Sequence, residues 1–215
     1  MNVLVPLLAA AFCCFLLWGD IPSEWKTAKL TPVHKKGPNT VPQNYRMLAV
    51  SGVFYRFFAG CVNDMVMNWA EYKGCLPQSQ FGFVPGRSTL QAAFSLRHCV
   101  ETAKANRHQL FSVFLDFQAA YDIVDRRLLF EHLHGLGMPE QLLALIRHVY
   151  QGDVYVLVDG DKQARVESKR GVKQGCPMSP TLFALYISDL PQAIRQHDHE
   201  QGARTGLADL VTSNL

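Results

Sequence analysis

Residues 112–122 read Ser-Val-Phe-Leu-Asp-Phe-Gln-Ala-Ala-Tyr-Asp, and residues 170–180 read Arg-Gly-Val-Lys-Gln-Gly-Cys-Pro-Met-Ser-Pro. The first stretch lies in an apolar run, Phe111 to Leu115, that predicts a buried strand ending on the carboxylate of Asp116. A strand that delivers one acid at its end is a common way to hold a divalent metal. The second stretch is a Gly/Pro-rich turn before an apolar helical pattern, where backbone can come close to a flat ligand.

Helices and hairpins are mixed along the rest of the chain. Ser88 and Gln91 form a capping box that predicts the start of one helix. Further helices are expected over residues 3–18, 53–72, 125–136, 139–150 and 181–190, and strands over 28–33, 45–50, 154–158 and 163–167. The regular strand-helix alternation of a parallel sheet is not visible, and the tail from Pro191 is polar and weakly patterned. The pattern therefore indicates an α+β fold.

Length and composition suit one globular domain, since the chain has 215 residues and 48% hydrophobic content. The net charge of +3 is compatible with a nucleic-acid partner and fits a basic channel better than a wholly basic surface. The six cysteines form no Cys-x-x-Cys pair and no Cys/His metal spacing. They are interpreted as reduced thiols of an intracellular protein.

The N-terminal run from Val3 to Trp18 is apolar throughout and has two interpretations. A signal peptide has basic residues before its apolar run and a small-x-small cleavage site after it. This run has no preceding Lys or Arg and no clear cleavage site. It is also shorter than the roughly 20 residues that span a bilayer. A buried core helix is the expectation, and a secreted or membrane-anchored protein is the alternative.

The two quoted stretches resemble the palm of a reverse transcriptase, most closely the kind found in non-LTR retrotransposons. The resemblance covers roughly residues 12–190 and includes Pro22-Ser23-Glu24-Trp25-Lys26 after the first helix. It implies a right-hand polymerase with fingers and a partial palm, and with the thumb absent. Residues 1–108 would be the N-terminal helix and fingers. Residues 109–215 would be the palm, carrying a helical pair and hairpin over 125–170 and ending before the palm is complete.

The resemblance also implies a catalytic metal site. Asp116 and Asp209 would be the catalytic acids and would ligate two Mg²⁺ ions, with help from the Phe117 carbonyl. Asp209 lies in Leu207-Ala208-Asp209-Leu210, where the family places a second acid at the position of Leu210. A leucine cannot ligate Mg²⁺, so this chain is expected to be inactive alone.

Nucleotide and template contacts are implied in the same way. The residues expected to bind the nucleotide are Lys35, Lys36, Arg46, Phe117, Tyr121, Gln174 and Gly175. Tyr121 would lie under the sugar and exclude a 2′-hydroxyl, or would simply be a packing residue. Lys35 and Lys36 would contact the triphosphate or be a solvated loop. The residues expected near template or primer are Gln80, Phe81, Gly82 and Arg87.

The function implied is Mg²⁺-dependent, RNA-templated nucleotidyl transfer onto a primer 3′-hydroxyl in the intact parent protein. The expected partners are an RNA template, a DNA primer and deoxynucleoside triphosphates, with no membrane and a nuclear or cytoplasmic location. Two alternatives remain open. One is a group II intron-type reverse transcriptase, and the other is a degenerate retroelement fragment that at most binds nucleic acid.

Overall fold

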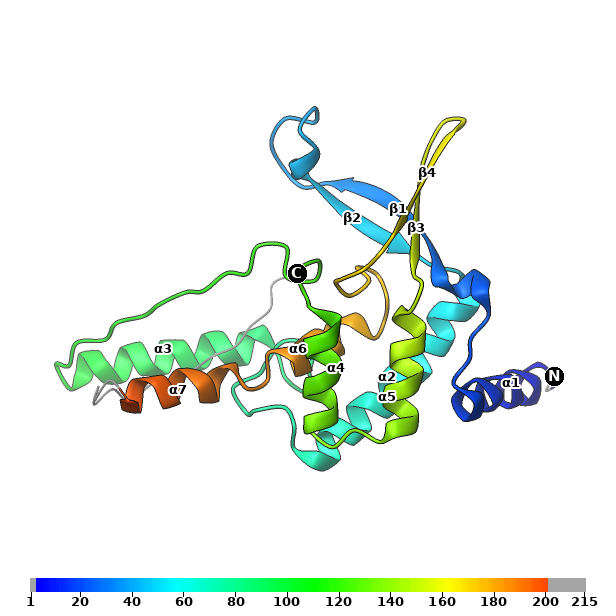
Figure 1. The fold of residues 1–215 in the computed structure, drawn as a ribbon. Helices are drawn as coiled ribbons and strands as arrows, with labels where there is room; N and C mark the ends of the chain where they lie inside the picture. The colour runs from blue at the N-terminus through cyan, green and yellow to red at the C-terminus, as the bar shows by residue number, and fades with distance from the viewer. Residues whose placement is uncertain (1–2, 201–215) are drawn as a thin grey trace.

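The computed structural model describes residues 3–200 and has the expected α+β composition (Figure 1). The helices are α1 (Leu4–Trp18), α2 (Val53–Lys73), α3 (Thr89–Ala105), α4 (Arg126–Gly135), α5 (Glu140–Tyr150), α6 (Ser179–Tyr186) and α7 (Leu190–Glu200). The strands are β1 (Thr27–His34), β2 (Tyr45–Val50), β3 (Val154–Asp159) and β4 (Lys162–Glu167). Both predicted hairpins and the capping box of Ser88 are confirmed.

The four strands form one mixed sheet in the order β2-β1-β3-β4. The two hairpins are each antiparallel, but β1 pairs with β3 in parallel, Thr27 opposite Val154 through Leu30 opposite Leu157. The sequence did not predict this junction, because the chain between the two hairpins contains several helices. The sheet therefore combines strands from both sides of residue 108.

The core lies among α2, α4, α5 and α6, beneath the sheet in Figure 1. Leucines at helical spacing build it, for example Leu129 and Leu133 of α4, which are fully buried. Helix α1 packs on this core through Phe12, whose ring lies 5.0 Å from that of Phe58. The helix expected over residues 3–18 is therefore present as α1. Only one side of it is buried, because Leu7 and Trp18 on the other side are exposed. Among residues 3–200, no helix combines the length and apolarity needed to cross a bilayer.

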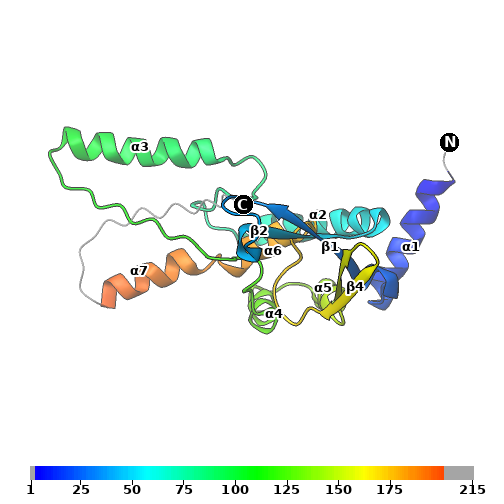
Figure 2. The same cartoon turned by 90° about the horizontal axis from the view of Figure 1, so that it is seen from above.

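The predicted strand over Phe111–Leu115 is wrong. Residues 108–117 have no regular secondary structure and run as a lone extended chain between α3 and α4 (Figures 1 and 2). The side chain of Phe114 is 81% exposed. A strand needs a hydrogen-bonded neighbour, and none of the described strands lies beside this segment. The apolar run is therefore present without the sheet that it predicts.

The tail after Pro191 also differs from the prediction. Residues 190–200 form α7, whereas the helix predicted over 181–190 is α6 and ends at Tyr186. Pro191 sits in the first turn of α7, where the missing N–H costs no helical hydrogen bond. Polar residues dominate the rest of α7, and this composition concealed its helical period.

Candidate nucleotide-binding site

The loop of residues 171–175 lies against the turn that contains Asp122. Gly171 N–H donates to Val124 O at 2.8 Å, and Val172 N–H donates to Tyr121 O at 2.9 Å. Gly171 has φ +82°, and a Cβ there would lie 2.9 Å from Tyr121 O. Only glycine fits this contact. The stretches 112–122 and 170–180 therefore meet through their backbones.

The same loop docks on the free edge of β2. Ala49 N–H donates to Gln174 O at 2.7 Å. Gly175 has φ +111°, and a Cβ there would lie 2.9 Å from Ala49 O. Gly175 was expected to allow close approach of a ligand, and the close approach seen here is to the backbone of the strand. Gln174 is thus fixed between β2 and the Asp122 turn.

A side-chain contact joins the two stretches as well. Gln174 Nε2 donates to both carboxylate oxygens of Asp122, each at 3.1 Å. The structure therefore brings Gln174 and the Tyr121–Asp122 turn together across 52 positions of sequence. Asp125, three residues further on, caps α4 by accepting from the backbone N–H groups of Arg127 and Leu128.

Phe117 and Tyr121 converge on Phe183 of α6. Their ring centroids lie 6.4 Å and 5.4 Å from that of Phe183. Tyr121 is buried, and desolvation raises its pKa above the ordinary value. Its hydroxyl has no hydrogen-bond partner among the described residues. The ring of Tyr121 therefore makes packing contacts with Phe183 on one side.

The expected metal ligands are not assembled within the described residues. Asp116 is exposed in the extended segment, and Asp209 lies outside residues 3–200. Over those residues, no group of three His, Cys, Asp or Glu side chains is placed to hold a metal ion. The described part of the chain supplies one expected carboxylate ligand, Asp116, together with the Phe117 carbonyl, and by itself does not fit a two-metal site.

The predicted phosphate-binding residues lie on the β1–β2 hairpin. Lys35 and Lys36 are exposed just beyond β1, and Lys35 N–H donates to Asn44 O at 2.8 Å, which extends the hairpin. Arg46 is exposed on β2 opposite Val33. The three cations therefore share one hairpin. Its strand β2 also donates the hydrogen bond from Ala49 to the carbonyl of Gln174.

The loop predicted to contact the template is held by hydrogen bonds among its own residues. Gln80 is buried, and its Nε2 donates to Gly82 O at 3.0 Å. Arg87 donates to the carbonyls of Pro77 and Gln80. These contacts make Gln80 an internal residue of the loop and leave Phe81 and part of Arg87 facing a pocket.

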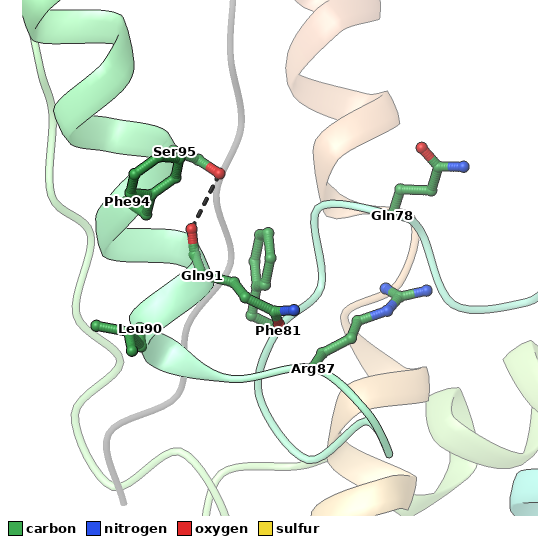
Figure 3. A pocket seen from close by; sticks show the side chains of 7 residues that line it. All are labelled: Gln78, Phe81, Arg87, Leu90, Gln91, Phe94 and Ser95. Atoms are coloured by element: carbon green, nitrogen blue, oxygen red, sulfur yellow. Dashed lines mark hydrogen bonds between the residues drawn. The ribbon is translucent and has the colours of Figure 1, made fainter.

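That pocket, of about 640 Å³, lies between the loop and α3 (Figure 3). It is lined by Gln78, Phe81, Arg87, Leu90, Gln91, Phe94 and Ser95. In Figure 3 Phe81 lies between Arg87 and the α3 side chains Leu90 and Phe94. An aromatic and aliphatic wall beside one guanidinium suits a flat ring that carries negative charge nearby.

Sequence reasoning missed a buried ion network beneath the site loop. Lys173 Nζ lies 2.8 Å from Asp153 Oδ1, and both side chains are completely buried. Arg126 Nη2 lies 3.4 Å from Asp153 Oδ2 and donates to Ser168 Oγ at 2.7 Å. Burial raises the pKa of Asp153, and the two cations oppose that rise. The three charges join α4, the residue immediately before β3 and the Gln174 loop.

Arg126 adds carbonyl contacts to this network. Its guanidinium donates to the carbonyls of Tyr150, Ser168 and Gly171, each at 2.8 Å. The sequence signal was weak: a lysine between Val172 and Gln174 looks like a surface charge in a turn. Nothing in the spacing of Arg126, Asp153 and Lys173 indicates that they meet.

A solved structure shares this arrangement of elements. The apo telomerase of Candida tropicalis, truncated from its C-terminal domain, superposes with a TM-score of 0.54 at 13% identity. The match covers 91% of this chain and 45% of that one. At this identity the likeness shows a shared fold alone.

The sequence profile described as "Reverse transcriptase (RNA-dependent DNA polymerase)" matches residues 33–205, and the chain belongs to this family. The RNA-directed DNA polymerase from mobile element jockey of Drosophila melanogaster is 26% identical over 86% of this chain and 20% of its own length. The probable RNA-directed DNA polymerase from transposon BS of the same fly is 27% identical, with the same coverage. The element R2DM polyprotein is 26% identical over 90% of this chain and 18% of its own length.

These relatives confirm the resemblance to polymerases of non-LTR retrotransposons. The chain spans about one fifth of the length of these curated relatives.

Proposed function

We propose that this chain forms the nucleotide-binding part of a polymerase that copies RNA into DNA. The observation that carries the proposal is the junction of the Asp122 turn, the Gln174 loop and the edge of β2. Three segments distant in sequence meet there, and the hairpin that holds Gln174 also carries Lys35, Lys36 and Arg46. One side of the junction thus offers hydrogen-bonding groups, and the hairpin offers cations for a triphosphate.

Each residue has a distinct role in this proposal. Lys35, Lys36 and Arg46 bind the triphosphate, with Arg46 making the bidentate contacts that guanidinium allows. Gln174 contacts the incoming nucleotide from its fixed position. Tyr121, backed by Phe183, presents its ring under the sugar and excludes a 2′-hydroxyl. Arg87 and Phe81 contact the template through phosphate and stacking, while Gln80 and Gly82 shape their loop.

The proposed metal site needs chain outside residues 3–200. Asp116, with the Phe117 carbonyl, and Asp209 would hold Mg²⁺, which neutralises triphosphate charge when bound. The exposed apolar segment over residues 108–117 fits this proposal. It carries the apolar run of a strand and has no neighbouring strand in the described chain. A strand from the rest of the palm would therefore cover Phe114, which is exposed here, and fix Asp116. Residues 1–108 would form the N-terminal helix and fingers, and residues 109–215 the palm. The β3–β4 hairpin, expected in the palm, shares one sheet with β1 and β2, so we propose that it extends the fingers.

Binding of dTTP to the purified chain, in buffer containing Mg²⁺, tests the proposal. Isothermal titration should show that Gln174→Ala weakens binding by about 3- to 10-fold, as expected for one neutral hydrogen bond. Arg46→Ala should weaken it by more than about 10-fold, as expected for a charge-assisted contact. Arg97→Ala is the matched control, because Arg97 is an exposed cation on α3 paired with Glu101. Equal affinity of all four proteins would contradict the proposal.

Primer extension tests whether residues 1–215 are sufficient for polymerisation. With a DNA primer, an RNA template and Mg²⁺, we expect no extension by this chain. We expect it to bind the primer–template in a salt-sensitive way that Lys35→Ala with Lys36→Ala weakens. Extension that Asp116→Ala abolishes would show that residues 1–215 complete the site, and would make the expected inactivity wrong.

A further inference from the structure

The contact between Gln174 and Asp122 decides which end of the Gln174 carboxamide faces the site. An ionised carboxylate accepts hydrogen bonds and cannot donate them. Gln174 must therefore turn its NH₂ group to Asp122, as the two 3.1 Å contacts show. Its Oε1 atom has no hydrogen-bond partner within the described chain. We propose that Asp122 is a positioning residue that makes Gln174 a hydrogen-bond acceptor toward the nucleotide.

Backbone hydrogen bonds around Asp122 and Gln174 hold the two side chains in this relative orientation. Asp122 N–H closes a tight turn on Ala119 O at 2.9 Å. On the other side, the Gln174 carbonyl is held by Ala49 at 2.7 Å. The paired bonds of Gly171 and Val172 with residues 121–124 lie between these two anchors. Because both ends are fixed by main-chain contacts, the carboxamide has little freedom to leave Asp122.

An acceptor at this position selects a donor on the ligand. A nucleotide offers two kinds, the 3′-hydroxyl of the sugar and the N–H groups of the base. The proposal rests on the proposed function, in which Gln174 contacts the nucleotide, and adds that the group recognised is an O–H or N–H. A nucleotide lacking that donor leaves a desolvated Oε1 unpaired, which is the costly outcome for a hydrogen-bonding site.

The test uses three probes with the purified 215-residue chain and Mg²⁺: dTTP, 2′,3′-dideoxy-TTP and N3-methyl-dTTP. The wild-type chain should bind one of the two analogues about 3- to 10-fold more weakly than dTTP, as expected for one hydrogen bond. The analogue that is disfavoured identifies the sugar or the base as the source of the donor. Asp122→Asn should remove the discrimination, because an amide can accept or donate and leaves Gln174 free to flip.

A double variant separates orientation from simple support of the fold. In Asp122→Asn with Gln174→Glu, the asparagine donates to the glutamate and leaves a glutamate oxygen facing the site. The net charge equals that of the wild type, and the discrimination should return. Asp161→Asn, in the β3–β4 turn, is the matched control. Circular dichroism melting of each variant checks that it is folded.

Each result has one meaning. Full discrimination in Asp122→Asn, or none in the double variant, would overturn the inference while leaving the proposed function intact. Wild-type affinity for dTTP in Gln174→Ala, or no binding of dTTP by the wild-type chain, would overturn the proposed function itself, and this inference with it.

Discussion

Lys173 and Asp153 form an ion pair in which neither side chain is exposed to solvent. The Lys173 ammonium also lies 4.8 Å from the ring centroid of Tyr55, so an aromatic face supplies part of its surroundings. Arg126 provides a second cation for Asp153, but Asp153 is the one carboxylate paired with Lys173 among the described residues. Loss of Lys173 would therefore leave Asp153 with one cation, whereas loss of Asp153 would leave Lys173 with no carboxylate partner among the described residues.

Asp153→Asn should destabilise the chain more than Lys173→Met. The first change leaves a buried ammonium unpaired, which typically costs about 3–5 kcal/mol. The second leaves Asp153 with Arg126 and replaces the lysine stem by an apolar one of similar length. Urea unfolding would measure both, with Glu131→Gln in an exposed pair as the control. Equal losses for the two variants would show that Arg126 does not hold Asp153.

Gly171→Ala should be more damaging than Gly152→Ala. Both glycines have positive φ, and the strain of a left-handed alanine is about 1–2 kcal/mol at each. A Cβ at Gly171 would also meet Tyr121 O at 2.9 Å, whereas nothing lies within 4 Å at Gly152. Denaturant unfolding should give Gly171→Ala a loss at least about 1 kcal/mol larger. Similar losses would mean that the Asp122 turn moves away freely.

Tyr121→Phe should leave the stability unchanged or raise it by about 1 kcal/mol. The Tyr121 hydroxyl is buried without a hydrogen-bond partner in the described chain, and such a group costs stability. The ring contact with Phe183 is kept. Tyr121→Val should instead destabilise, because it removes the ring and leaves a cavity. A clear loss in Tyr121→Phe would reveal a partner for the hydroxyl.

Cys176 should resist thiol reagents while Cys13 reacts. Burial raises the pKa of the Cys176 thiol, so the reactive thiolate is scarce at neutral pH. Its Sγ lies 3.3 Å from the Tyr55 hydroxyl, inside the core. Cys13 is exposed on α1. Alkylation at pH 8 followed by peptide mass spectrometry should label Cys13 first and Cys176 only after urea is added. Early labelling of Cys176 would show that the core opens locally.

Most helices and both hairpins were predictable from the sequence, because the residues that start and end them are close together along the chain. Helix α3 begins at Ser88 through a capping box that is readable from two residues. Both hairpins follow from apolar strand segments on either side of turns that contain Gly with Asn or Asp. The strand predicted over Phe111–Leu115 is wrong for the opposite reason. An apolar run is a property of one segment, whereas a strand also requires a hydrogen-bonded partner segment. The pairing of β1 with β3 was likewise invisible, because it depends on how intervening helices pack.

The amino-acid sequence by itself determined the family and the residue types of the candidate site. Asp116, Tyr121 and Gln174 stand in motifs whose spacing is a property of the chain alone. Only the tertiary structure decided that Gln174 turns its amide to Asp122 and that Lys173 is buried against Asp153. The physical reason is that hydrogen bonds and ion pairs depend on separation and direction in space. Residues 52 positions apart acquire both only when the chain between them has packed.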